Sequence, residues 1–219
     1  MNKLVSWLSK IFLAPILQLL FIKEIKGKEN IPKRNFILAS NHASHLDQVA
    51  NGVVCVPRKF SFIGQVDAYK GFGKIVRDAL YSLGGVIRLD RRSVKSKEKG
   101  IEKAIKYLNE NNSLIIYPEG TRTRTGEIGA GKWGIVKLLF ATKVPILPVA
   151  LSGTFDLFPP KGKLKIKKII KINIGKPIYF TKEIEEAKKL DEDSKEYKQL
   201  MHNVTEKIMQ KIKELKKTT

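Results

Sequence analysis

Short apolar runs alternate with helical segments along the chain from residue 35 onward. Apolar runs typical of buried strands lie at 36–40, 60–63, 85–89, 114–117 and 146–151. Helices are predicted at 47–54, 69–83, 101–108 and 133–142. Hydrophobic residues recur there at helical spacing, or residues that end helices follow the segment. This alternation predicts an α/β fold in which a mixed, largely parallel central sheet is flanked by helices.

The first segment differs from this pattern, because residues 4–22 are almost wholly apolar. In a helix this run would reach roughly 28 Å, the thickness of one hydrocarbon core. Lys10 lies inside the run, Pro15 is expected to kink or split the helix, and lysines follow in place of a cleavage site. We therefore expect a membrane-associating helical segment at residues 1–28, lying in one leaflet, and an α/β domain at 29–219. The sequence leaves open a helix packed on the protein's own core.

The last third of the chain is rich in lysine. Residues 161–171 hold six lysines with four apolar residues between them, which predicts a strand with one apolar and one charged side. Lys167 and Lys168 interrupt that alternation. Thr181 is expected to cap a short helix. After Ser194, apolar positions every three or four residues predict an amphipathic helix with a lysine-rich outer face.

Composition narrows the class of protein without deciding it. The chain has 219 residues and a formal net charge of +21, which indicates an anionic partner: nucleic acid, anionic lipid or an acidic protein. A hydrophobic content of 42% excludes a disordered chain, and the single cysteine, Cys55, excludes a disulfide framework or a cysteine-rich zinc site. Aromatic residues make up only 8%, which leaves little material for stacking single-stranded nucleic acid.

One histidine follows a predicted strand and has an aspartate five residues later. His42 stands just after the strand at 36–40, and Asp47 opens the next predicted helix. If the chain turns between them, the carboxylate can accept from one ring nitrogen and leave the other nitrogen as a general base. A polar turn residue beside a helix cap is the structural alternative. His45 has a spacing from Asp47 that is less suited to pairing, and His202 stands at a surface position of the C-terminal helix.

The sequence offers no protein nucleophile for this histidine to activate. It contains no nucleophile elbow, Walker loop or dinucleotide fingerprint, and Cys55 lies in an apolar run typical of a core residue. The simplest remaining chemistry is a histidine that deprotonates a hydroxyl of the substrate, which then attacks a carbonyl directly.

Two strand ends carry groups that can bind an anion. In the turn after the strand at 114–117, Gly120 frees the backbone, so that its amides, Thr121 and Arg122 can converge on a phosphate. Glu119 would orient the arginines there or bind a substrate hydroxyl, although a surface turn with a Glu–Arg pair is the alternative. Three arginines crowd the end of the strand at 85–89 and favour the same kind of ligand: Arg88, Arg91 and Arg92.

Four motifs, in this order between Ile31 and Phe180, resemble the family of glycerol-3-phosphate and 1-acylglycerol-3-phosphate acyltransferases. Asn41-His42 followed by Asp47 is similar to the family's catalytic motif, which implies that the histidine is the base and that the aspartate orients it. The second motif, Gly85 to Arg91, implies Arg91 as a ligand of the acceptor's phosphate. The third implies four residues at the acceptor site: Glu119, Gly120, Thr121 and Arg122.

The fourth motif, Val144 to Val149, resembles the family's proline-bearing strand, which implies Pro145 and Pro148 beside the acyl pocket. The chain departs from the family at one place. Many members carry a Phe-x-x-Lys segment after the first motif, whereas this chain has Gln65 at the position of that lysine. Either Lys70 takes over the phosphate contact or the acceptor differs from the usual one.

The resemblance implies a 1-acyl-sn-glycerol-3-phosphate O-acyltransferase that makes phosphatidate at the cytoplasmic face of the cell membrane. The acyl thioester of acyl carrier protein or coenzyme A would be a co-substrate, and we expect neither a cofactor, a metal nor a nucleic-acid partner. Both donors and an anionic membrane surface suit a chain of net charge +21. Glycerol 3-phosphate or another lysolipid as acceptor, and a His–Asp thioester or lipid hydrolase, are the alternatives that the sequence leaves open.

Overall fold

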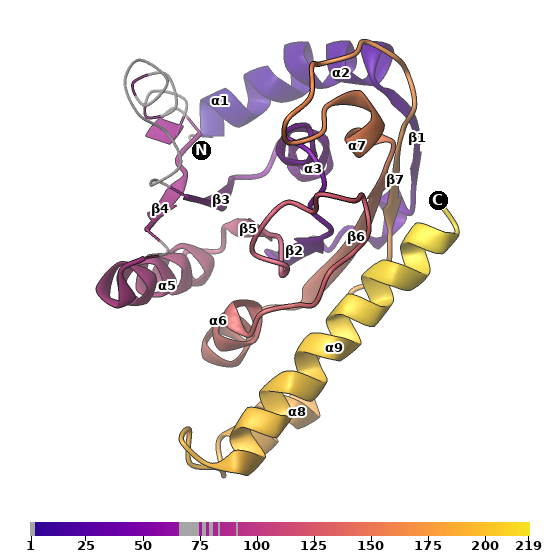
Figure 1. Ribbon diagram of the computed structural model, residues 1–219. Coiled ribbons are helices and arrows are strands. Elements are labelled where there is room, and N and C mark those ends of the chain that lie inside the picture. Colours follow the sequence, from indigo (N-terminus) through magenta and orange to yellow (C-terminus); the bar gives the residue numbers. More distant parts are fainter. Residues whose placement is uncertain (1–2, 66–74, 76–77, 79–80, 83, 91) are drawn as a thin grey trace.

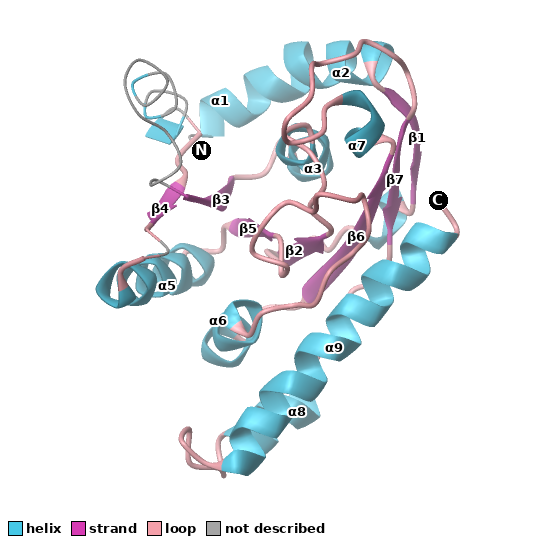
Figure 2. Cartoon of the chain, viewed as in Figure 1, coloured by secondary structure: helices cyan, strands magenta, loops and turns pink. Residues whose placement is uncertain are grey.

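The computed structural model describes residues 3–65, 75, 78, 81–82, 84–90 and 92–219. Most of the helix expected over 69–83, together with Lys70 and Arg91, lies outside the described residues. The described part of the chain forms one α/β unit with a central sheet, as the sequence predicted (Figure 2).

The sheet is mixed and largely parallel. Its strand order is β1-β7-β6-β2-β5-β3-β4, and among the paired strands only β6 and β7 run antiparallel within the described residues. The strands are β1 (Ile22–Lys26), β2 (Ile37–Ser40), β3 (Phe60–Gln65), β4 (Ile87–Leu89), β5 (Ser113–Ile116), β6 (Ile146–Ser152) and β7 (Ile170–Ile174). Three of them match the predicted runs to within one residue at each end: β2, β5 and β6. β3 extends two residues beyond its predicted run, and β4 begins two residues later than predicted.

Helices cover both faces of the sheet because the central strands are apolar on both faces. In β2, Ile37 and Ala39 pack toward one core, whereas Leu38 packs toward the other. The first core is covered by α5 (Val94–Asn109), α6 (Gly134–Thr142), α8 (Thr181–Ala187) and α9 (Lys195–Lys217). The second is covered by α3 (Asp47–Cys55), α7 (Thr154–Leu157) and the end of the N-terminal helix (Figure 1).

The direction of the connections reverses between β2 and β5, which are neighbours in the sheet. From β2 the chain passes through α3 to β3 on one side, and from β5 it passes through α6 to β6 on the other side. The two connecting helices lie on opposite faces. In open α/β sheets the carboxyl ends of two such strands border a crevice that binds ligands.

The N-terminal apolar segment is one helical rod with a π-helical turn in its middle. It consists of α1 (Lys3–Leu8), η1 (Ser9–Leu13) and α2 (Ala14–Leu20). The interruption expected at Pro15 is this turn and not a break: the Ala14 N–H donates to the Ser9 carbonyl, and Pro15 stands in the first turn of α2. By length and composition, Lys3–Leu20 is able to cross a membrane, and only 11% of it is buried.

Three sequence predictions need correction. Residues 22–26, which the sequence assigned to the N-terminal helical segment, form edge strand β1 and pair with β7. The strand predicted over 161–171 begins only at Ile170, because residues 161–168 are all exposed and offer no face to bury, whereas β7 buries its apolar positions. Thr181 is the first residue of α8 and makes no cap.

Ser194 does cap the last helix, since its hydroxyl accepts from the Tyr197 N–H.

Burial decides which isoleucines hold the fold together. Ile208 of α9 is 0% exposed within the first core, whereas Ile166 is 71% exposed. We expect Ile208→Ala to lower the free energy of unfolding by about 2–5 kcal/mol, because it leaves a cavity. Ile166→Ala is the matched control and should change it by less than ~0.5 kcal/mol. Urea denaturation measures both, and equal losses would contradict the packing described here.

Candidate active site

The turn that leaves β2 is fixed to the neighbouring strand by one side chain. The buried Asn41 amide donates to the Leu151 carbonyl over 3.0 Å, and its oxygen accepts from the Leu151 N–H over 2.8 Å. Ser44, three residues on, donates to the Phe158 carbonyl at 2.6 Å. These bonds hold the turn rigidly at the carboxyl end of β2, where the next side chain, His42, emerges.

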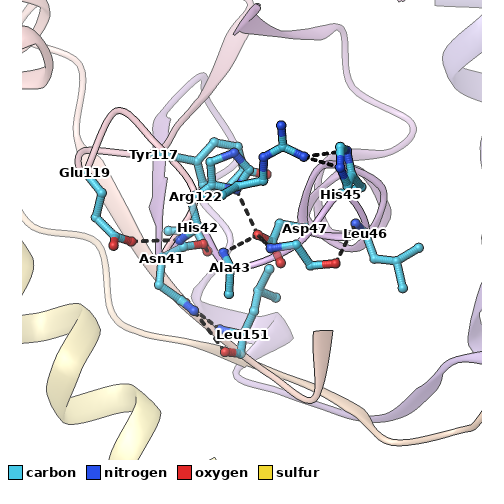
Figure 3. Close-up of polar contacts among 12 residues, drawn as sticks. Asn41, His42, Ala43, His45, Leu46, Asp47, Tyr117, Glu119, Arg122 and Leu151 are labelled. Atoms are coloured by element: carbon cyan, nitrogen blue, oxygen red, sulfur yellow. Dashed lines mark hydrogen bonds and ion pairs between the residues drawn. The ribbon is translucent and has the colours of Figure 1, made fainter. Parts of the chain in front are cut away.

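His42 and Asp47 are in direct contact, at 2.8 Å between Nδ1 and Oδ2 (Figure 3). The Asp47 carboxylate is fully buried, and the same oxygen accepts from the backbone N–H groups of Ala43 (2.6 Å) and Ser44 (2.7 Å). It stands in the first turn of α3, where the helix dipole favours negative charge. With Nδ1 engaged, the other ring nitrogen, Nε2, remains to accept a proton.

Tyr117 stacks on the His42 ring, with centroids 4.0 Å apart and planes 14° apart. It follows β5, the parallel neighbour of β2, so the carboxyl ends of the two strands bring the rings together. Burial and the nearby Asp47 charge raise the pKa of the Tyr117 hydroxyl well above its usual value, so this ring stays neutral. Sequence reasoning treated Tyr117 only as a strand end and missed this contact.

Glu119 binds the backbone of the histidine turn. Its side chain is only 6% exposed, and its two oxygens accept from the N–H groups of His42 (2.8 Å) and Gly129 (2.9 Å). Burial raises the pKa of the Glu119 carboxyl, and these two hydrogen bonds oppose the shift. From the sequence we expect Glu119 to orient the arginines or to bind a substrate hydroxyl. Among the described residues its hydrogen bonds go to these two amides, and binding of a substrate hydroxyl stays a prediction.

Arg122, which lies in the turn after β5 with Glu119, contacts His45. The Arg122 guanidinium lies against the His45 ring within hydrogen-bond reach (Figure 3). The His45 ring also packs near Phe158, with ring centroids 4.9 Å apart. Burial and the Arg122 charge lower the pKa of His45. At neutral pH His45 is therefore an uncharged support for Arg122.

A lysine that sequence reasoning missed completes the cationic edge of this turn. Gly120 has a left-handed φ of +69°, and a Cβ added there would lie 3.0 Å from Cδ and 3.1 Å from Nζ of Lys132. The Lys132 N–H donates to the Pro118 carbonyl over 2.8 Å. Thr121 is exposed beside them. No sequence signal marks Lys132, because it stands twelve residues from the glycine that it covers.

The remaining predicted site residues lie further out. Pro145 precedes β6, and Pro148 is buried within it, against Gly175. The backbone of Gln65 pairs with Leu89 at the end of β3. The two prolines stay predicted residues of an acyl pocket. Arg91 stays a predicted ligand of the phosphate.

Comparison with known proteins assigns the family. The family model described as Acyltransferase matches residues 23–152, a range that contains the turns after β2 and β5. The chain belongs to the acyltransferase family. A 1-acyl-sn-glycerol-3-phosphate acyltransferase of Borreliella burgdorferi is 32% identical over 88% of this acyltransferase and 72% of that relative.

Other relatives share part of their length with this acyltransferase. A Limnanthes douglasii protein of the same name is 34% identical over 67% of this chain and 50% of its own, so the chain spans about half of that plant relative. The crystal structure of the 1-acyl-sn-glycerophosphate acyltransferase PlsC from Thermotoga maritima aligns with a TM-score of 0.65, covering 96% of this chain and 79% of that one. At 24% identity, that likeness supports the fold.

The raised pKa of Glu119 predicts how the free energy of unfolding changes with pH. Because the native carboxyl keeps its proton above pH 4.5, where the unfolded one has lost it, the free energy of unfolding falls as the pH rises through that window. Glu119→Gln removes this slope, so its melting temperature should gain on the wild type as the pH rises above about 4.5.

Glu185→Gln is the control of opposite sign. A hydrogen bond from Lys188 lowers the pKa of Glu185, so the wild type should gain on this variant as the pH rises toward about 4.5. Thermal melts across the acid range measure both differences. A difference for Glu119→Gln that does not change with pH would contradict the burial of its charge.

Proposed function

We propose that this acyltransferase is a 1-acyl-sn-glycerol-3-phosphate O-acyltransferase, which joins an acyl group from a thioester to the sn-2 hydroxyl of a lysophosphatidate and forms phosphatidate. One observation carries the proposal: the His42–Asp47 contact at the switch point of the sheet, with the second ring nitrogen unused by the aspartate. Relatives of that name support the choice of substrate.

His42 acts as the general base in this proposal. Its Nε2 accepts the proton of the substrate hydroxyl while the oxygen attacks the thioester carbonyl, and the thiol then leaves with a proton returned from the imidazolium. Asp47 fixes the tautomer and stabilises the imidazolium, and the stacked Tyr117 ring limits rotation of the imidazole. No protein nucleophile takes part, since the thioester is already activated.

The acceptor phosphate binds on the turn after β5. Lys132 lies beside Gly120, and Arg122 stands two residues further along the same turn, so both supply positive charge there. The left-handed backbone at Gly120 allows a close approach to the turn. Thr121 adds a hydroxyl, and Arg91 is a further ligand in this proposal. Holding the phosphate there delivers the hydroxyl to His42. Positioning of this kind lowers the activation free energy by several kcal/mol, and by roughly 7–11 kcal/mol in the most favourable cases.

The donor and the membrane complete the proposal. The acyl thioester of acyl carrier protein or coenzyme A is the co-substrate, and no resident cofactor or metal is needed. The exposed apolar helix Lys3–Leu20 associates with the membrane at its cytoplasmic face, where the acceptor and the product are embedded.

Replacing the proposed base should abolish most of the activity. We expect His42→Ala to lower kcat at least ~100-fold in an acyl-transfer assay with radiolabelled thioester, because general-base help is lost. His45→Ala is the control, and it should mainly raise the acceptor KM through its effect on Arg122. Equal losses of kcat in both variants would contradict the assignment of the base.

Replacing the proposed phosphate ligands should act on the acceptor alone. Arg122→Ala and Lys132→Ala should each lower kcat/KM for the acceptor by about 10-fold or more, with the thioester KM unchanged. The same assay, run with lysophosphatidate, glycerol 3-phosphate or no acceptor, separates the possible reactions. Free fatty acid released at the same rate without acceptor would indicate a hydrolase, and a preference for glycerol 3-phosphate would change the substrate.

A further inference from the structure

The loop between α7 and β7 carries exposed apolar and basic side chains together. All of residues 161–168 are exposed, including two large apolar side chains, Leu164 (47%) and Ile166 (71%). Lysines surround these two residues: Lys161, Lys163, Lys165, Lys167 and Lys168. Single exposed apolar residues are common on protein surfaces, but Leu164 and Ile166 stand two residues apart with lysines on both sides of each. Anionic lipid headgroups over an apolar layer match both kinds of side chain.

One end of this loop is joined to the candidate active site. Phe158, just before the loop, accepts the hydrogen bond of Ser44 through its carbonyl and packs beside the His45 ring. Within the loop, the Lys165 N–H donates to the Leu157 carbonyl over 2.9 Å, which holds its middle close to α7.

The other end of the loop is joined to the apolar N-terminal helix. The Ile170 N–H donates to the carbonyl of Phe21, the residue that ends α2, over 2.8 Å. Ile169 packs into the same core as Phe21 and Leu17. In Figure 1 the loop is the orange segment between α7 and β7, drawn at the same edge of the molecule as α2. The C-terminal end of the loop and the end of the apolar helix are therefore joined at one edge of the molecule.

We propose that residues 161–168 form a second membrane-contacting element, which inserts Leu164 and Ile166 at the bilayer interface and binds anionic headgroups through its lysines. The inference rests on the proposed membrane function of the N-terminal helix and adds a second point of contact. Two contacts fix the orientation of the enzyme on the bilayer. The turn after β2, which carries His45 and is hydrogen-bonded to Phe158 through Ser44, then faces the headgroup layer that holds the acceptor, together with Arg122 of the turn after β5.

A triple variant tests the proposal against a control of the same composition. Ile166→Ser with Lys165→Gln and Lys167→Gln removes one apolar and two basic side chains from the loop. Val94→Ser with Lys95→Gln and Lys97→Gln removes a similar set from the start of α5, where Val94 is 68% exposed. Each lysine at an anionic surface is worth about fivefold in affinity, so we expect the loop variant to bind vesicles with about one-third anionic lipid at least ~25-fold more weakly. The control should change by less than ~2-fold if α5 does not touch the bilayer.

A dye reports insertion directly. Cys55 is buried, so an environment-sensitive thiol dye would label Ile166→Cys or Val94→Cys selectively. We expect the dye at residue 166 to brighten on vesicles and the dye at residue 94 to stay unchanged. Unchanged vesicle affinity of the triple variant together with a silent dye at residue 166 would overturn the proposal.

Activity separates this inference from the proposed function and from a protein partner. The loop variant should lose transfer to acceptor embedded in vesicles and keep transfer to a short-chain, water-soluble lysophosphatidate. An unmodified enzyme inactive on every acceptor would refute the proposed function, while the vesicle and dye measurements still report on the loop. A raised KM for acyl carrier protein with normal vesicle binding would overturn the membrane proposal and assign the loop to that acidic protein.

Discussion

A single buried carboxylate oxygen organises the candidate site. Oδ2 of Asp47 accepts from the His42 ring and from two backbone amides of the turn that precedes it. A charge without water around it is costly unless hydrogen bonds compensate it, so the turn has to fold around the aspartate. The backbone geometry of the turn and the orientation of the imidazole are thus set by one requirement. Removing the aspartate would release both at once.

The parallel sheet provides the second constraint. Since β2 and β5 are parallel neighbours, the turn with His42 and the turn with Glu119 leave the same edge of the sheet. The Glu119 carboxylate then joins the turns through the His42 N–H, and the Thr123 N–H donates to the His42 carbonyl over 2.8 Å. His42, the proposed base, and the turn proposed to bind the phosphate are therefore parts of one hydrogen-bonded structure, in which each turn limits the motion of the other.

The proposed membrane contact uses two neighbouring parts of the molecule. The helix Lys3–Leu20 exposes most of its apolar side chains, and the lysine-rich loop at 161–168 joins it to the edge of the candidate site through Phe21 and Phe158. An acceptor with one acyl chain and one phosphate resides at the depth where apolar and headgroup layers meet. In the proposed arrangement, docking with both the helix and the basic loop brings the enzyme to the acceptor at that depth.

The sequence by itself determined the α/β class and most strands and helices, because local hydrophobic patterns contain that information. The spacing of His42 and Asp47 allowed their contact but left a polar turn residue beside a helix cap as the alternative, and the resemblance of four ordered motifs favoured the contact that the fold shows. The sequence did not determine that Glu119 binds amides, that Tyr117 stacks on His42, that Lys132 covers Gly120, or that residues 161–168 form an exposed loop. Those facts depend on which strands become neighbours and on which segment pairs with β1. Such contacts join residues far apart in the chain, and only burial in the folded sheet selects among them.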